Sequence, residues 1–177
     1  MRKDALTLIE VMITLSILTI VFSLTFGVMR IYDISLTMGN TMTQVSAAAN
    51  LALDKMREEL MLSASSQITL LNDNTSPQPD ELTFKIVTGL DSEQNIQWGD
   101  GVTEGRDIKY YIGNIDKPNQ LIREAGTKTI LANDITDLQF SLTGNSLRID
   151  ITAGRPTQRG IVPAVDFSSS TMVDFKN

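Results

Sequence analysis

The 177-residue chain contains neither cysteine nor histidine. Without cysteine it can form no disulfide, and its redox compartment is left open. Without histidine it lacks the commonest general base, the commonest metal ligand and the usual charge switch near neutral pH. Most hydrolase sites are therefore excluded before any motif is considered.

Lysine and arginine are sparse: the chain has 15 of them against 21 aspartates and glutamates, for a formal net charge of −6. They are scattered beyond the first few residues and build no basic face, so nucleic acid is not an expected partner. The chain has neither a Gly-rich phosphate loop nor a Gly-x-Ser-x-Gly elbow. The sequence therefore predicts no catalytic residue and no cofactor site, and we expect a protein that is not an enzyme.

Five acids lie between Asp91 and Asp107, where a calcium site is conceivable. An EF-hand loop carries its acids at alternating positions before a glycine, and this stretch does not match that spacing. Acid-rich solvated loops are common, so the sequence predicts no metal site.

Proline is absent from Met1 to Ser76, and charge is almost absent from Leu6 to Met29. This apolar run of roughly two dozen residues would make a helix of about 36 Å, enough to cross a hydrocarbon core of about 30 Å. It is longer than the core of a secretory signal, and no Ala-x-Ala-like site follows closely. We therefore predict a membrane-spanning helix over residues 6–29. Arg2 and Lys3 precede it and favour a cytoplasmic N-terminus, with the rest of the chain outside.

Glu10 is the one ionisable side chain inside this predicted span. A carboxylate in hydrocarbon is costly, and such residues are functional by default and have a partner. The span contains no cation at the same depth. The partner of Glu10 must therefore come from another molecule or from processing of the chain.

The residues from Ala5 to Leu18 read ALTLIEVMITLSIL. This stretch resembles the N-terminal signature of type IV prepilins and type II secretion pseudopilins, in which a prepilin peptidase removes a short basic leader and the new N-terminus is methylated. The resemblance implies a leader of residues 1–5, cleavage between Ala5 and Leu6, and methylation of Leu6. Ala5 stands where glycine is usual in the family, and Leu6 where phenylalanine is usual. The resemblance also implies that Glu10 pairs with the N-terminal amine of a neighbouring subunit during assembly.

Small side chains follow one side of the predicted span, roughly opposite Glu10. A ladder of small residues lets helix backbones approach closely in lipid, which predicts a helix-packing face. The alternative is that the hydroxyls merely bond to their own helix. The residues concerned are Ser16, Thr19, Ser23 and Gly27.

Beyond the span, apolar residues recur every three or four positions, which predicts an amphipathic helical stem over residues 30–64. The simplest arrangement is one helix from near Leu6 to about Leu62. Methionine and alanine dominate the stripe where leucine and isoleucine would specify a coiled coil, so we expect it to pack on a globular domain. The stripe consists of Ile31, Ile34, Met38, Met42, Val45, Ala49, Leu53, Met56 and Leu60.

Residues 65–177 show the two-residue period of half-buried strands, which predicts an antiparallel β domain and an α+β, pilin-like fold. Gly144-Asn145 and the turn Asp116–Asn119 each predict a hairpin. The stretch Leu90–Arg106 has no periodicity and is interpreted as a surface loop. The predicted strands are Ile68–Leu71, Glu81–Thr88, Ile108–Gly113, Gln120–Glu124, Thr129–Leu131, Asp137–Thr143, Leu147–Thr152 and Thr171–Phe175.

The order of these segments, IKYYIG, NQLIREAG, ILANDITDLQFSLTGNSLRIDITA and a final VDFKN, is similar to the outer domain of J-type minor pseudopilins and W-type minor pilins. This resemblance implies a minor subunit near the tip of a type II secretion pseudopilus. The alternatives are a minor pilin of a type IV pilus or DNA-uptake filament and, from another class, a single-pass anchored exoplasmic binding protein.

The resemblance also implies the partners and the location of the chain. Its partners would be the prepilin peptidase, other minor and major pilins or pseudopilins, an inner-membrane assembly platform and membrane lipid. The chain would cross the inner membrane once, with its C-terminal domain periplasmic or extracellular, and would be incorporated in the pilus or pseudopilus.

Overall fold

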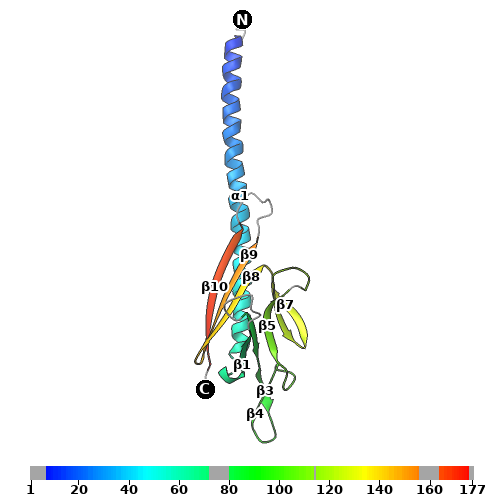
Figure 1. Ribbon diagram of the computed structural model, residues 1–177. Helices are drawn as coiled ribbons and strands as arrows, with labels where there is room; N and C mark the ends of the chain where they lie inside the picture. The colour runs from blue at the N-terminus through cyan, green and yellow to red at the C-terminus, as the bar shows by residue number, and fades with distance from the viewer. Residues whose placement is uncertain (1–6, 72–79, 114, 156–163, 176–177) are drawn as a thin grey trace. The chain divides into compact units, whose positions relative to one another are not determined.

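The computed structural model describes residues 7–71, 80–113, 115–155 and 164–175 (Figure 1). The chain divides into two compact units, Met1–Asn40 and Thr41–Asn177. The described part of the first unit is almost entirely helical, and the second unit combines a helical segment with antiparallel sheets. The α+β, pilin-like architecture predicted from the sequence is confirmed.

One helix, α1, covers Leu8–Leu60 and contributes residues to both units. No proline interrupts it, which is why a helix of this length can form. It ends in a tightened turn, where the Leu62 amide donates to the Glu59 carbonyl and the Ser63 amide to the Leu60 carbonyl. The predicted limits, near Leu6 and about Leu62, agree with the observed ones within two residues.

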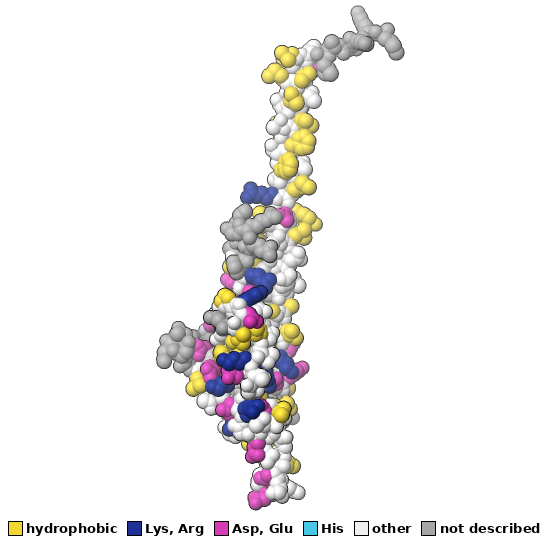
Figure 2. Space-filling model, turned by 90° about the vertical axis from the view of Figure 1, so that its right-hand side faces the viewer, with side chains coloured by type: hydrophobic (Ala, Val, Ile, Leu, Met, Phe, Trp, Pro, Cys, Tyr) yellow, Lys and Arg dark blue, Asp and Glu magenta, His cyan; other side chains and the backbone are white. Residues whose placement is uncertain are grey.

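The helix of the first unit exposes its side chains on all sides. Every described residue from Thr7 to Asp33 is exposed, and Figure 2 shows hydrophobic side chains in a row along this helix. An apolar helix without a buried face in its own unit suits a hydrocarbon surrounding.

The second unit contains three antiparallel sheets. Their strand orders are β1-β2-β5-β6-β7, β10-β9-β8 and β3-β4. The short 3-10 helix η1 (Ser65–Gln67) leads from α1 into the first strand. The strands are β1 (Ile68–Leu71), β2 (Glu81–Phe84), β3 (Ile86–Leu90), β4 (Ile96–Gly99), β5 (Ile108–Gly113), β6 (Gln120–Ala125), β7 (Thr127–Ala132), β8 (Ile135–Thr143), β9 (Ser146–Arg155) and β10 (Val165–Asp174).

Both hairpins expected from the turn residues form. Thr143 of β8 pairs with Ser146 of β9 across Gly144-Asn145, and Gly144 has a positive φ of 60°. Gly113 of β5 pairs with Gln120 of β6 across the second turn. A two-residue hairpin loop needs a positive φ at its first position, which glycine adopts without strain.

One predicted strand and the surface loop predicted after it are wrong. The predicted strand Glu81–Thr88 is two strands, because β2 pairs with β1 and β5 whereas β3 pairs with β4. The break falls at Lys85, whose carbonyl accepts a hydrogen bond of 2.7 Å from the Ser63 hydroxyl. The stretch interpreted as a surface loop contains β4, so Leu90–Arg106 is partly a hairpin. Its few apolar residues stand among acids and amides, so they do not alternate.

The core of the second unit lies between α1 and the two larger sheets. Val45, Leu53 and Leu60, from the predicted stripe, are 4% exposed or less, whereas Ile31 is 67% exposed. The buried face therefore begins at Val45. The aromatic rings of Phe84 and Tyr110 stack against each other in this core, with centroids 5.7 Å apart.

A buried polar cluster joins α1 to the five-stranded sheet. The Arg123 Nε donates to both carboxylate oxygens of Glu59, at 3.0 and 2.9 Å, and the Tyr110 hydroxyl donates to Glu59 at 2.8 Å. The two charged side chains are only 20% and 13% exposed. Because all three groups find partners in one another, the charge is held inside the unit without an unpaired member.

We expect the fragment starting at Arg30 to fold as a soluble α/β unit, and Leu53→Asp to destabilise it by about 3–5 kcal/mol, since the new charge would be buried without a partner. Leu53 is 4% exposed and Leu51, two residues away, is 68% exposed. Leu51→Asp is therefore the matched control and should change stability little. Urea denaturation of the three proteins measures the difference. Equal destabilisation by both changes would contradict the assigned helix face.

Burial, and next the neighbouring Glu59 charge, raises the pKa of Tyr110 well above its ordinary value. A tyrosine with a raised pKa in the folded state contributes stability below about pH 10, which is lost as the pH rises, because the unfolded chain releases the proton first. Below pH 10 we expect Tyr110→Phe to be less stable by about 1–2 kcal/mol, through the lost hydrogen bond. This difference should shrink above about pH 10. Unfolding free energies from pH 7 to 11 test it, and a difference that stays constant would refute it.

Candidate functional site

The start of α1 is closed by a reciprocal pair of side chains, Thr7 and Glu10. The Glu10 Oε2 accepts the Thr7 backbone N–H at 2.8 Å and the Thr7 hydroxyl at 2.9 Å. In return, the Glu10 N–H donates to the Thr7 hydroxyl oxygen at 3.4 Å. This is the capping-box pattern of a threonine followed three residues later by a glutamate, and it satisfies backbone N–H groups that the first helical turn leaves open.

The cap leaves the charge of Glu10 uncompensated within the described residues, where no Lys or Arg forms an ion pair with it. Arg30, the next cation along α1, lies 20 residues further on, about 30 Å along the helix axis. The carboxylate is exposed, so a cation from outside the described chain can reach it. The site thus holds an oriented anion on an apolar helix.

The predicted packing face carries side chains whose hydroxyls bond to their own helix. Ser16 donates to the Met12 carbonyl at 2.9 Å, Thr19 to Leu15 at 2.8 Å and Ser23 to Thr19 at 2.9 Å. These bonds satisfy the hydroxyls as the alternative interpretation expects. The side chains on this face are also short, and their hydroxyl donors are already used, as close packing of two helices requires. Whether a second helix packs there stays a prediction.

Gly27 ends this face, and a Cβ atom placed on it would have no heavy atom of the chain within 4 Å beyond its neighbours and its own turn of helix. Nothing in the described part of the chain therefore requires glycine at this position. The structure brings Glu10, Ser16, Thr19, Ser23 and Gly27 onto one exposed helix. Ala5 and Leu6, the predicted cleavage and methylation positions, lie outside the described residues.

Sequence reasoning missed the part that Thr7 plays. The signal was present, because Thr-x-x-Glu directly before an apolar run is a helix N-terminus pattern. In the structure, Thr7 is the residue that orients the Glu10 carboxylate.

Two acids of the stretch between Asp91 and Asp107 have local structural partners. Asp91 accepts the amides of Glu93 and Asn95, each at 2.8 Å, and bonds from Asn95 hold the pKa of its carboxyl below the ordinary value. Asp100 accepts the Val102 and Thr103 amides, and the bonds from Thr103 and then Val102 lower its pKa likewise. Among the described residues, no three acid side chains converge as they would around a metal ion.

Comparison with known families finds one match, to the prokaryotic N-terminal methylation motif over residues 1–26. No curated protein and no solved structure matches the chain. In the described part of the chain, α1 is the one helix long and apolar enough to cross a membrane. The matched motif covers the predicted leader, Thr7, Glu10 and about the first third of that helix. The chain therefore carries the type IV prepilin-like signal at its N-terminus, on a single-pass membrane anchor joined to an antiparallel β domain.

Proposed function

We propose that the chain is a minor pilin or pseudopilin subunit, a structural component that assembles through α1 into a filament. Glu10 is the observation that carries the proposal. It is a carboxylate on an exposed apolar helix, within the matched methylation motif, with no cation beside it in the described residues. A simple anchor has no use for such a group, because an ionisable side chain makes insertion into lipid harder.

The proposed processing supplies the missing cation. Cleavage between Ala5 and Leu6 creates a new amine at Leu6, which is then methylated and remains positively charged. The amine of one subunit pairs with Glu10 of the next in a low dielectric, where an unpaired carboxylate is strongly disfavoured. The pair thereby attracts neighbouring helices to each other and also fixes the register between them.

Thr7 prepares this contact in the free subunit. Its N–H and hydroxyl hold the Glu10 carboxylate at the first turn of α1 while no cation is present. The hydrogen bonds lower the cost of keeping the anion in an apolar surrounding, and one carboxylate oxygen is sufficient for them. The other oxygen is available to a neighbour's amine.

The orientation follows from the charges beside the span. Arg2 and Lys3 precede the helix and favour a cytoplasmic N-terminus. The second unit then lies on the outer side of the cytoplasmic membrane, periplasmic or extracellular. There the chain would meet an assembly platform in the inner membrane and other pilins or pseudopilins.

We favour a J-type minor pseudopilin or W-type minor pilin near the filament tip, supporting protein secretion. The support is the order of hairpins in the second unit, β5–β6 and β8–β9 followed by a C-terminal strand, β10. A type IV pilus or DNA-uptake filament would use the same N-terminal chemistry. A single-pass anchored binding protein is the candidate from another class, and it differs because it would not depend on Glu10.

The first test combines processing with a series of changes at Glu10. With a prepilin peptidase present, we expect the mature chain to begin at Leu6 and its amine to be methylated, as measured by N-terminal mass spectrometry. We expect Glu10→Leu and Glu10→Gln to be inserted and cleaved normally, because a removed charge eases insertion. Incorporation into the filament should fall in the order Glu, Asp, then Gln and Leu, since only the carboxylates can pair with an amine.

A chain that still begins at Met1, or that is cut after residue 20, would exclude the proposed processing. Equal incorporation of the wild type and of Glu10→Asp, Glu10→Gln and Glu10→Leu, measured in the sheared filament fraction by immunoblotting, would exclude the charge pair. Thr14→Val is a suitable control. The Thr14 hydroxyl donates to the backbone carbonyl of Glu10 at 2.6 Å and does not bond to the Glu10 carboxylate.

The second test concerns the packing face. We expect Gly27→Leu to block close approach of a second helix, and to reduce the recovery of the chain in high-mass complexes after formaldehyde cross-linking of cells. A Cβ at this position has no described heavy atom within 4 Å beyond its neighbours and its own turn of helix, and leucine favours a helix more than glycine does, so we expect the fold of the subunit to be unharmed. Val28→Leu, about 100° around the helix axis from Gly27, is the control. If Gly27→Leu cross-links like the wild type, this face does not pack.

A further inference from the structure

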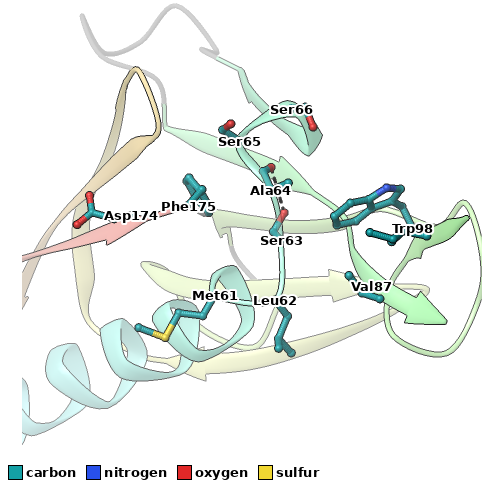
Figure 3. A pocket seen from close by; sticks show the side chains of 11 residues that line it. Met61, Leu62, Ser63, Ala64, Ser65, Ser66, Val87, Trp98, Asp174 and Phe175 are labelled. Carbon is teal, nitrogen blue, oxygen red and sulfur yellow. Dashed lines mark hydrogen bonds between the residues drawn. The ribbon is translucent and has the colours of Figure 1, made fainter. Parts of the chain in front are cut away.

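A groove of about 920 Å³ lies in the second unit, at the end of α1. Figure 3 shows Met61 and Leu62 from the helix end on one side, and Val87 and Trp98 from the β3–β4 hairpin on another. Phe175, after β10, closes a further side. Together with Ile96 these side chains make a mainly apolar surface, which we call the hairpin groove.

The large apolar side chains of the hairpin groove are open to solvent. Met61 and Leu62 are 57% and 56% exposed, and Ile96 is 53% exposed. Isolated exposed apolar residues are common, but several gathered in one hollow mark a site of interaction. The grouping is maintained by the fold, because the Val87 amide donates to the Leu62 carbonyl at 3.2 Å and ties the hairpin to the helix end.

Much of the polar surface of the groove is already bonded within the chain. The Ser63 hydroxyl donates to the Lys85 carbonyl, and the Ser65 hydroxyl donates to the Asn145 side chain at 3.1 Å. A ligand in this groove would therefore be held mainly by apolar contacts, and its specificity has to come from the groove's surroundings.

Those surroundings are acidic. Residues 86–105 contain four carboxylates, Asp91, Glu93, Asp100 and Glu104, and no Lys or Arg. Of these four carboxylates only Asp100 forms an ion pair within the described residues, with Arg106 at 3.3 Å. The tip of the hairpin, which holds Asp91 and Glu93, adjoins Ile96. Glu104 forms a β-bridge with Gly99, which follows Trp98. Figure 2 shows carboxylate side chains gathered at the end of the unit formed by this hairpin.

We propose that the hairpin groove docks a segment of a partner protein that presents apolar side chains flanked by lysine or arginine. The apolar side chains occupy the groove beside Trp98, and the cations lie against the carboxylates of Asp91, Glu93 and Glu104, which form no ion pair within the described residues. Complementary charge at the rim of an apolar site selects the partner and speeds its encounter. The site is separate from the Glu10 region and is independent of the proposed filament chemistry.

Trp98 is the single tryptophan of the chain, so its fluorescence reports directly on the groove. The full chain in a nonionic detergent is titrated with three hexapeptides, (Leu-Lys)₃, (Leu-Glu)₃ and (Ser-Lys)₃. We expect a saturable blue shift with (Leu-Lys)₃, and at least tenfold weaker responses with the other two. The response to (Leu-Lys)₃ should weaken with added salt and in Glu93→Gln.

A matched pair of variants locates the binding. Met61 lines the groove and Met172 lies on β10 outside it, and both are 57% exposed. Met61→Ser should weaken binding at least fivefold, and Met172→Ser should leave it unchanged. The proposal is overturned by the absence of a saturable shift, by an equal shift with (Leu-Glu)₃ or (Ser-Lys)₃, or by equal loss in both variants. A shift that depends on protein concentration without peptide would assign the groove to a second copy, and would overturn it too.

Discussion

The contact between the buried face of α1 and the two larger sheets is the interaction on which the second unit depends. Val45, Ala49 and Met56 of the helix share one core with Phe84 of β2, Phe140 of β8 and side chains of the other strands. Each sheet is antiparallel and apolar on one face, and a sheet of this kind is stable only when that face is covered. The helix covers both sheets at once, so the strands, hairpins and loops are positioned relative to this one element.

Two glutamates on the same helix show how its two units differ. Glu59 is 13% exposed and is held by Arg123 and Tyr110, so its charge is balanced inside the unit. Glu10 has hydrogen bonds from Thr7 and no cation among the described residues. A carboxylate whose charge is balanced internally contributes to structure. One that is oriented but not balanced is suited to bind a cation supplied by another molecule.

The sequence could predict the elements that follow a strong local rule. The long apolar run, the absence of proline and the two-residue alternation led to α1, β5 and β8–β9 within a few residues. The hairpin β3–β4 could not be found in this way, because the change of strand pairing at Lys85 has no local signal. The contact made there comes from the Ser63 hydroxyl, 22 residues earlier in the chain. Of the site, the sequence predicted Glu10, because an ionisable side chain in a membrane span is costly as a general rule. The geometry of its hydrogen bonds required coordinates.

The failure of pattern reasoning at residues 86–105 has a physical meaning. In a strand whose sequence is set by the core alone, apolar and polar residues alternate, because one face is buried and the other is exposed to solvent. In this hairpin Ile96 and Leu90 are exposed beside Asp91 and Glu93, so its sequence is not explained by the core alone. Sequences depart from local rules where another demand acts on them, and functional surfaces are the commonest such demand. The N-terminal motif and the hairpin are thus two distinct departures: a charge placed in an apolar run, and apolar side chains placed among charges. Each is costly for an isolated chain, and in both proposals a second molecule provides what is missing.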